Sequence, residues 1–339
     1  MKKISTIGLD IAKRVFQIHG VDDTGKVVVQ KQVGRSELLD WFGKQEPCLV
    51  GMEACATANY WARELSRLGH DVRLIPPAYV KAYVRRQKND RADAAAICEA
   101  VSRPSMRFAT LKTTTQQVVQ VLHRTRELLI KQRVQLGNAL RAHLAEFGHI
   151  FPQGAAGLDK TLGFVTENAG DLPEELMGIL RVYVEQITRL RETLKGLERD
   201  MLLWHRSQQD SLRLATIPGI GTVTASAIVA AIGDGQQFHS GREFAAWIGL
   251  VPRQNSSGGK ERLGRISKQG NAYLRQLLVT SATNYLRGER HARAVGGTWF
   301  SQLLKRKPGR LATVALANKM ARVAWAVLTK GETYHAMPA

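Results

Sequence analysis

The chain has 339 residues, of which 44% are hydrophobic and 23% are charged. These fractions match ordinary soluble domains and exclude a collagen-like or largely disordered chain, and the length suffices for two or three domains. Lysine and arginine number 49 against 29 aspartates and glutamates, a formal net charge of +20 at pH 7. An excess of this size repels itself unless a polyanion neutralises it, so nucleic acid is the leading class of partner.

The positive charge is concentrated towards the C-terminus, where residues 208–339 hold 18 basic and 6 acidic side chains. Cys48, Cys55 and Cys98 form no Cys-x-x-Cys pair, which argues against a disulfide framework or zinc site and fits a reducing cytoplasm. Asp10 interrupts the first apolar run before a signal peptide could form. No apolar stretch approaches the ~20 residues that span a bilayer, so we expect no membrane partner.

Residues 1–110 alternate between strand and helix patterns. β-Branched runs at 4–9, 15–20 and 26–33 predict a three-stranded meander. A helix around 38–42, a strand ending at 53, a helix near 57–68 and a strand at 72–75 follow. Two further helices are predicted at 78–89 and 90–103. The order β-β-β-α-β-α-β-α predicts a mixed α/β domain.

Residues 111–207 are predicted to form a long-helix segment. Helices at 112–147 and 174–206 would be joined by a loop at 148–172 that glycine and proline punctuate. The second helix has apolar side chains in alternating steps of four and three, the 3.5-residue period of a coiled-coil seam. Its partner is either the other long helix of the same chain or another copy in a dimer or tetramer. The seam consists of Leu176, Leu180, Tyr183, Ile187, Leu190, Leu194, Leu197 and Met201.

Residues 208–330 are predicted to form a helical domain with one long loop at 252–270. The segment IPGIGTVTASA has the form of a helix-hairpin-helix, in which Gly219 and Gly221 would let backbone N–H groups approach a phosphate. An ordinary tight turn between two helices explains the same residues.

The 252–270 loop gathers five cations around a pair of adjacent serines followed by a pair of glycines. A glycine-flanked serine hydroxyl can reach a phosphorus atom while cationic groups hold the phosphate and stabilise its developing charge. A phosphate-binding loop whose serines only form hydrogen bonds is the alternative. No histidine lies nearby in sequence, which leaves Ser-His-Asp hydrolysis unsupported. The residues are Ser256, Ser257, Gly258 and Gly259, with Arg253, Lys260, Arg262, Arg265 and Lys268 as candidate nucleic-acid contacts.

Four carboxylates stand at the ends of predicted elements. Asp10 ends the first strand, Glu53 ends the fourth, and Asp90 and Asp93 share one face of a helix. Two divalent ions held by such a set could clamp the attacking and leaving oxygens of a phosphodiester, and Mg²⁺, with Mn²⁺ as a substitute, suits carboxylate ligands. Taken singly, each acid is also explained as a turn or helix-start residue. Cations beside them that suit a phosphate backbone are Arg85, Arg86 and Lys88.

The placement of these acids resembles the RuvC-like DEDD domain of the RNase H-like fold. With the long helices and the segments IPGIG, SSGGK and ISKQGN, roughly residues 4–330 resemble the insertion-sequence transposases that join such a domain to a serine-bearing transposase domain. The resemblance implies a Mg²⁺-dependent DNA recombinase of the prokaryotic cytoplasm and nucleoid. It also implies a homotetramer guided by a structured bridge RNA that pairs with donor and target DNA.

Carried over to this chain, the resemblance implies that Asp10, Glu53, Asp90 and Asp93 bind the metal. It further implies that Ser257 attacks a DNA phosphodiester to form a 5′-phosphoserine link, with the acids supplied by a different subunit. Because the serine is doubled in this chain, Ser256 remains an alternative nucleophile.

Two other classes of function remain open on the sequence. A metal-dependent DNA nuclease or junction resolvase would need only the four acids, but it leaves the basic serine loop unexplained. A non-catalytic DNA- or RNA-binding protein would need only the positive charge, and four placed carboxylates would weaken its binding of a polyanion.

Overall fold

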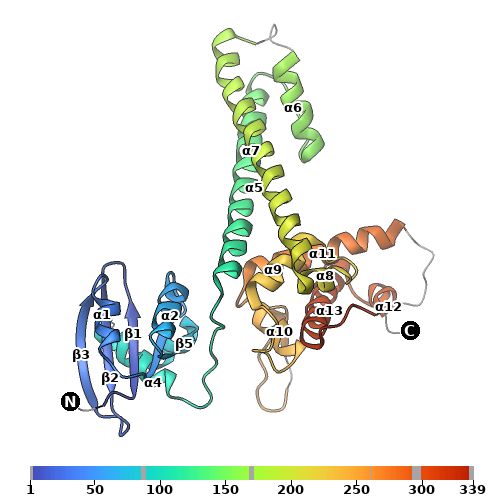
Figure 1. Ribbon diagram of the computed structural model, residues 1–339. Helices are drawn as coiled ribbons and strands as arrows, with labels where there is room; N and C mark the ends of the chain where they lie inside the picture. Colours follow the sequence, from blue (N-terminus) through green and yellow to red (C-terminus); the bar gives the residue numbers. More distant parts are fainter. Residues whose placement is uncertain (1–2, 85–88, 168–171, 261, 292–298, 336–339) are drawn as a thin grey trace. The chain divides into compact units, whose positions relative to one another are not determined.

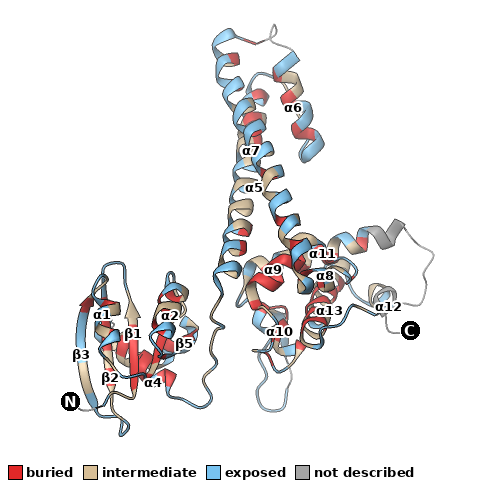
Figure 2. Ribbon diagram, viewed as in Figure 1, coloured by how far each residue is buried: buried red, intermediate tan, exposed pale blue. Residues whose placement is uncertain are grey.

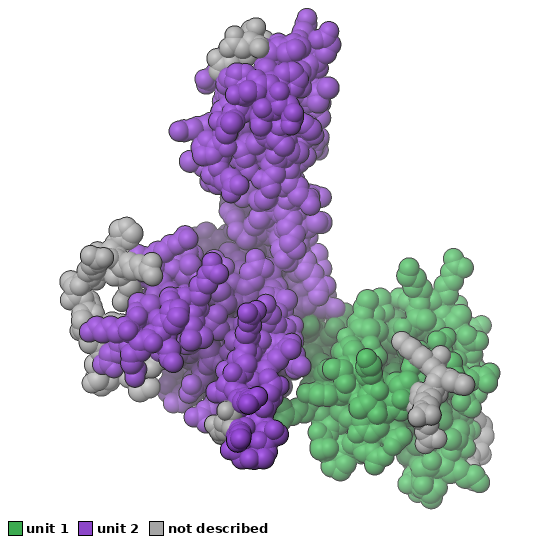
Figure 3. Space-filling model, turned by 180° about the vertical axis from the view of Figure 1, so that it is seen from behind, with its two compact units in different colours: residues 1–113 green, residues 114–339 purple. Residues whose placement is uncertain are grey.

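The computed structural model describes residues 3–84, 89–167, 172–260, 262–291 and 299–335. The chain forms two compact units, residues 1–113 and residues 114–339 (Figure 3). The finer division into 1–110, 111–207 and 208–330 stays a prediction.

Unit 1 is built on a five-stranded mixed sheet (Figure 1). Its strands lie in the order β3-β2-β1-β4-β5, and β1 pairs antiparallel with β2 and parallel with β4. β2–β3 is antiparallel and β4–β5 is parallel. The predicted mixed α/β sheet is therefore confirmed. The strands are β1 (Thr6–Ile11), β2 (Val15–Val21), β3 (Val27–Gly34), β4 (Leu49–Glu53) and β5 (Asp71–Ile75).

Helices cover both faces of this sheet, as the alternation of its side chains requires. Ile7, Leu9, Phe16 and Ile18 are fully buried in the core that includes α1 (Leu38–Gly43) and α2 (Ala58–Arg67). The intervening residues of β1 face α4 (Asp90–Val101), which is buried along the side that meets the sheet (Figure 2).

Two glycines let α4 approach the sheet closely. Gly8 of β1 and Gly51 of β4 are opposite each other in the parallel register. A Cβ atom on Gly8 would lie 2.1 Å from the carbonyl oxygen of Ala94, and one on Gly51 would lie 2.7 Å from the Cβ of Val101. Any side chain at either position would push the helix away, so these glycines set the distance between α4 and the sheet.

The predicted helix at 78–89 is wrong in its extent. The chain forms α3 (Pro77–Val80) and a 3₁₀ turn (Lys81–Tyr83), and Val84 is extended. Val80 is buried against α4, and the Asn89 side chain accepts a hydrogen bond from the N–H of Ala92. Because Asn89 caps a new helix, α4 begins there independently of α3.

Unit 2 contains two long helices, α5 (Thr114–Glu146) and α7 (Glu174–Ser207), which pack side by side in opposite directions (Figure 1). The seam residues that are buried recur every seven positions, at Leu180, Ile187, Leu194 and Met201. Part of the predicted seam is therefore buried within the chain.

The predicted loop at 148–172 is wrong in part, because it contains the helix α6 (Ala155–Glu167). Leu158, Leu162 and Val165 of this helix are buried in one cluster with side chains of α5 and α7. Burial of this apolar face against the helix pair stabilises α6 despite the glycines and proline that suggested a loop.

The remainder of unit 2 is a group of shorter helices with one two-stranded hairpin. One of its helices, α13 (Gly309–Lys330), is long and apolar enough by composition to cross a membrane, the one such helix among the described residues. Half of that stretch is buried, and Ala317, Ala321 and Ala324 lie in the core of the unit, as in the core helix of a folded domain. The elements are α8 (Gln209–Ala215), α9 (Thr222–Ile232), α10 (Gly241–Ile248), β6 (Pro252–Gln254), β7 (Leu263–Ile266), α11 (Ala272–His291), α12 (Trp299–Arg306) and α13 (Gly309–Lys330).

Substitution of Gly8 by alanine should destabilise unit 1 by about 2 kcal/mol or more, because the added methyl group overlaps the backbone of α4. Gly43→Ala is the matched control: Gly43 ends α1, and a Cβ there meets nothing within 4 Å. Alanine should leave stability unchanged at Gly43 or raise it by up to about 1 kcal/mol. Urea unfolding measures both, and equal effects of the two substitutions would contradict the close approach.

Candidate metal centre and serine hairpin

Three of the four predicted acids converge at the end of the sheet. Asp10 lies near the end of β1 on the face that α4 covers, and Asp90 and Asp93 lie in the first turn of α4. One carboxylate oxygen from each of the three lies within 4.8 Å of the others. Asp10 and Asp93 are partly buried, whereas Asp90 is exposed.

Glu53, the fourth acid, ends the neighbouring strand. β1 and β4 are parallel with Leu9 opposite Met52, so Glu53 comes next in register beside Asp10. It is not one of the three converging carboxylates. Its negative charge nevertheless acts on Asp10, because it contributes to the raised pKa of that group.

The electrostatics of the cluster disfavour a charged Asp10. Burial raises its pKa to about 6, and the charges of Asp93, Asp90 and Glu53 add to the rise. A helix N-terminus favours carboxylates, which accounts for Asp90 and Asp93 singly but not for the approach of a third and fourth acid. Gathered carboxylate oxygens are the ligands that a hard divalent cation prefers, and such a cation would remove the repulsion.

The predicted cations Arg85, Arg86 and Lys88 lie outside the described residues.

The serine segment forms a hairpin rather than the predicted loop. β6 and β7 pair antiparallel, and the N–H of Lys260 donates to the carbonyl of Ser257 at 3.1 Å. Gly258 and Gly259, the two residues between Ser257 and Lys260, have φ values of +55° and +76°. A two-residue hairpin turn needs positive φ at both central positions, which two glycines supply without strain. The sequence signal was present in the glycine pair, but the flanking strands are too short to recognise.

The two serines have different surroundings. The hydroxyl oxygen of Ser256 accepts a hydrogen bond from the N–H of Arg262 at 3.3 Å, which ties it to the opposite strand. Ser257 is exposed at the turn, and its hydroxyl has no hydrogen bond to any described residue. Of the two, the Ser257 hydroxyl is therefore the one that forms no hydrogen bond within the described hairpin.

The base of the hairpin is fixed although its tip is exposed. The guanidinium of Arg275 donates to the carbonyls of Ile248 and Gln269 at 2.6 and 2.8 Å, and so joins the end of α10 to the segment after β7. Arg253 donates to the carbonyl of Ser267 at 3.2 Å. Sequence reasoning missed Arg275, because nothing local marks a cation that bridges two backbone carbonyls.

The five predicted cations of this segment are exposed and form no ion pair with any described residue. Unpaired cations around an exposed hydroxyl can hold an anionic group beside it. They are Arg253, Lys260, Arg262, Arg265 and Lys268.

The two glycines of the predicted helix-hairpin-helix differ. Gly219 has a φ of +88°, a backbone conformation that residues with a side chain rarely adopt, so the turn itself already favours glycine. Gly221 is the N-cap of α9, and a Cβ there would meet nothing within 4 Å. A role in phosphate binding stays a prediction for both.

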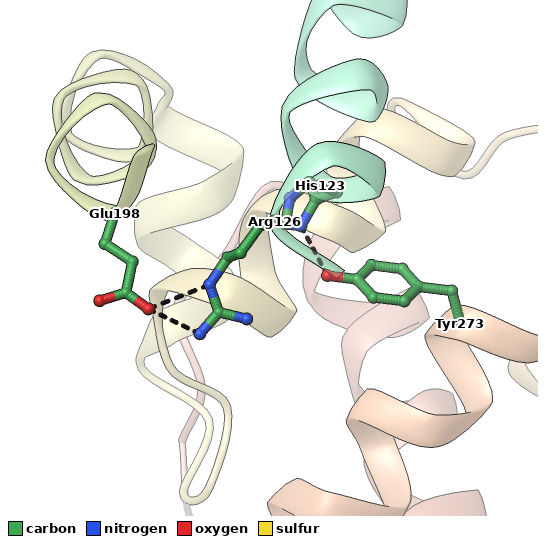
Figure 4. Close-up of polar contacts among 4 residues, drawn as sticks. All are labelled: His123, Arg126, Glu198 and Tyr273. Carbon is green, nitrogen blue, oxygen red and sulfur yellow. Dashed lines mark hydrogen bonds and ion pairs between the residues drawn. The ribbon is translucent and has the colours of Figure 1, made fainter. Parts of the chain in front are cut away.

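A buried histidine of α5, His123, forms hydrogen bonds to α9 and α11, and Figure 4 shows its contact with Tyr273 of α11 and the nearby ion pair of Arg126 with Glu198. The Ser226 hydroxyl donates to a carbonyl of its own helix α9, so it accepts from the Nε2–H of His123 at 3.1 Å. Nδ1 of His123 then accepts from the hydroxyl of Tyr273, in the first turn of α11, at 3.0 Å. Burial and the nearby Arg126 lower the pKa of His123 to about 4, which keeps it neutral. Arg126 also pairs with Glu198 at 2.8 Å.

Known proteins resemble this chain over both units. The family model described as transposase, of the DEDD IS110 type, matches residues 7–149, and the model of the transposase IS116/IS110/IS902 family matches residues 211–295. A probable family 20 transposase of Pseudomonas aeruginosa is 46% identical over 98% of both chains. The transposase for insertion sequence element IS1328 of Yersinia enterocolitica is 41% identical over 98% of this chain and 99% of its own.

The transposase for insertion sequence element IS1111A of Coxiella burnetii is 41% identical over 98% of this chain and 92% of its own. The chain belongs to the IS110/IS116 family of transposases. In this transposase the first matched region contains all four acids and the second contains the serine hairpin.

Substitution of Asp10 by asparagine should stabilise the transposase in EDTA at neutral pH. The raised pKa means that ionised Asp10 costs stability above pH 6, and that this cost fades as the pH falls towards 4, where both the folded and unfolded chains are protonated. We expect a gain of about 1 kcal/mol at pH 7.5, allowing for the partial exposure of the group. Asp23→Asn, at an exposed turn, should give no gain.

Thermal unfolding between pH 4 and pH 8 checks this expectation. Added Mg²⁺ should raise the melting temperature of the wild type and of Asp23→Asn more than that of Asp10→Asn. If Asp10→Asn is less stable than wild type at every pH, the conclusion that ionised Asp10 destabilises the fold is contradicted.

Proposed function

We propose that this transposase cleaves and exchanges DNA strands with Ser257 as the nucleophile and the four acids as a divalent-metal site. The observation that carries the proposal is the Ser257 hydroxyl, which is exposed at a tight turn without a hydrogen bond to any described residue. It belongs to a hairpin segment with five exposed cations that form no ion pair with any described residue. Family membership supports DNA as the substrate, because a transposase of an insertion sequence acts on DNA.

We infer an RNase H-like fold for unit 1. The strand order β3-β2-β1-β4-β5 supports it, as do an acid near the end of β1 and another at the end of the adjacent β4. The seven-residue spacing of buried side chains on α7 supports a coiled-coil segment, and the short turn between α8 and α9 supports a helix-hairpin-helix.

The donor set fits Mg²⁺, since every ligand atom in the cluster is a carboxylate oxygen. Asp10, Asp90 and Asp93 would hold the ion, and Glu53 would complete the set from the next strand. A bound ion would polarise a phosphodiester and neutralise part of its charge, and Mn²⁺ could substitute for it.

The serine step balances: one P–O bond forms for each P–O bond that breaks, and one proton is lost for each proton gained. The Oγ of Ser257 forms a bond to phosphorus, the bond from phosphorus to the 3′ oxygen breaks, and the serine proton leaves while the 3′ oxygen gains one. The product is a 5′-phosphoserine link and a free 3′ hydroxyl. Attack by another 3′ hydroxyl reverses the step and releases Ser257, which exchanges the strands. Arg253, Lys260, Arg262, Arg265 and Lys268 would hold the phosphate during both steps.

Ser257→Ala should abolish a Mg²⁺-dependent covalent protein–DNA adduct, whereas Ser256→Ala should retain most of it, because the Ser256 hydroxyl serves only the hairpin. Denaturing gel electrophoresis with end-labelled element DNA measures the adduct. An adduct that persists in both variants would contradict a serine nucleophile in this hairpin.

The alternatives give different results in the same assay. A nuclease or junction resolvase that needs only the acids would still nick DNA at nearly the wild-type rate after Ser257→Ala. A non-catalytic binding protein would show no change in any activity after Asp10→Asn.

We also propose that a structured guide RNA and a homo-oligomer, dimer or tetramer, take part, with the acids and the serine supplied by different subunits. The resemblance to guided recombinases supports the RNA partner, and the net charge of +20 supports a nucleic-acid partner of either kind. RNA sequencing of nucleic acid copurified with the protein should yield one discrete structured RNA encoded beside its gene. A nuclease-treated protein that has been allowed to bind cellular nucleic acid again is the control. If the untreated protein carries the same heterogeneous fragments as this control, RNA guidance is contradicted.

A further inference from the structure

Unit 1 has a cationic pocket that the proposed function does not use. It has a volume of about 570 Å³, and none of its lining residues is acidic. Its side chains come from the turn after β1, the end of β3 and the first turn of α2. The wall includes Lys13, Arg14, Arg35, Ser36, Tyr60 and Trp61.

The pocket lies at the end of the sheet that carries the acids. Lys13 and Arg14 follow Asp10 directly after β1. β3 is antiparallel to β2 and therefore ends at the same side, where Arg35 follows it. β4 is parallel to β1, so α2 also begins at this end, a few residues after Glu53.

Arg35 fixes the shape of the pocket. Its backbone N–H donates to the carbonyl of Arg14 at 2.9 Å, and its guanidinium donates to the carbonyl of Lys13 at 3.3 Å. The same guanidinium lies 5.1 Å from the ring centroid of Trp61 and 5.8 Å from that of Phe16. The turn that bears Lys13 and Arg14 is thereby tied to the aromatic wall.

Two cations of this pocket are available to a ligand. Lys13 and Arg14 are exposed and form no ion pair with any described residue. Exposed cations beside Arg35, in a pocket with no acidic lining residue, favour an anion with several acceptor oxygens.

We propose that this pocket binds a backbone phosphate of a nucleic-acid strand and that the ring of Tyr60 stacks on a neighbouring base. Tyr60 is 44% exposed beside the cations, and a cationic groove with an exposed aromatic ring is how single strands are commonly bound. The strand would then reach the end of the sheet where Asp10 and Glu53 lie. This destination rests on the proposed function, whereas binding in the pocket requires neither metal nor serine.

Photocrosslinking of the full chain tests the pocket. Single-stranded oligonucleotides with 5-iodouracil would be bound in EDTA and irradiated, and crosslinked peptides would be identified by mass spectrometry. DNA and RNA of one sequence distinguish the two sources of phosphate. We expect a crosslink at Tyr60, with a yield roughly fivefold or more lower in Lys13→Ala/Arg14→Ala. Lys26→Ala/Lys31→Ala removes equal charge from exposed positions outside the pocket and should keep the yield.

Absence of the Tyr60 crosslink with both DNA and RNA, or an equal yield in Lys13→Ala/Arg14→Ala, would overturn the proposal. A retained Tyr60 crosslink without a covalent serine adduct would contradict only the proposed function.

Discussion

The contact of α4 with the sheet at two glycines is the constraint on which the acidic site depends. With no side chain at Gly8 or Gly51, the backbone of α4 lies directly on β1 and its Val101 side chain lies on β4, so the first turn of α4 is held beside the end of β1. Burial of Ile97 and Val101 on α4 contributes about 3–6 kcal/mol, since each is almost fully removed from water. The burial of Asp10 and the neighbouring carboxylate charges, which together raise its pKa to about 6, cost at most about 3 kcal/mol. The packing of α4 is of at least similar size, so it can hold Asp10 beside the other acids.

In unit 2, the hairpin of β6 and β7 is held at its base by hydrogen bonds, whereas the hydroxyl at its turn has no bond to a described residue. Arg275 joins the end of α10 to the segment after β7 through two carbonyls, while the turn at Gly258 and Gly259 projects beyond the last strand pair. A hydroxyl at such a turn needs no other internal partner, because the backbone hydrogen bond between Lys260 and Ser257 already closes the hairpin. The fold thus leaves the hydroxyl available while limiting the movement of its backbone.

Local patterns in the sequence predicted the strands and the long helices. β-Branched runs indicated the first three strands, and the 3.5-residue spacing of apolar side chains indicated the seam of the second long helix. These patterns could not predict α6, which is stable because Leu158 and Leu162 meet helices distant in sequence. The acids at strand ends could be found, since strand ends are local, but which of them converge depends on how closely α4 approaches. The difference between Ser256 and Ser257 depends on a hydrogen bond from the opposite strand, so the sequence left both open.

The acids and the cations of unit 1 have to be considered together. Four carboxylates at one end of the sheet repel a phosphate backbone, and the same negative charge that would attract a divalent ion would exclude DNA before the ion binds. Lys13 and Arg14, which follow Asp10 within four residues of chain, place positive charge at that same end. Because they sit in a separate pocket, they can attract a strand without forming ion pairs with the acids and competing with the metal. Under the two proposals, separation of the two charges on either side of one strand end would let both a divalent ion and a nucleic acid bind.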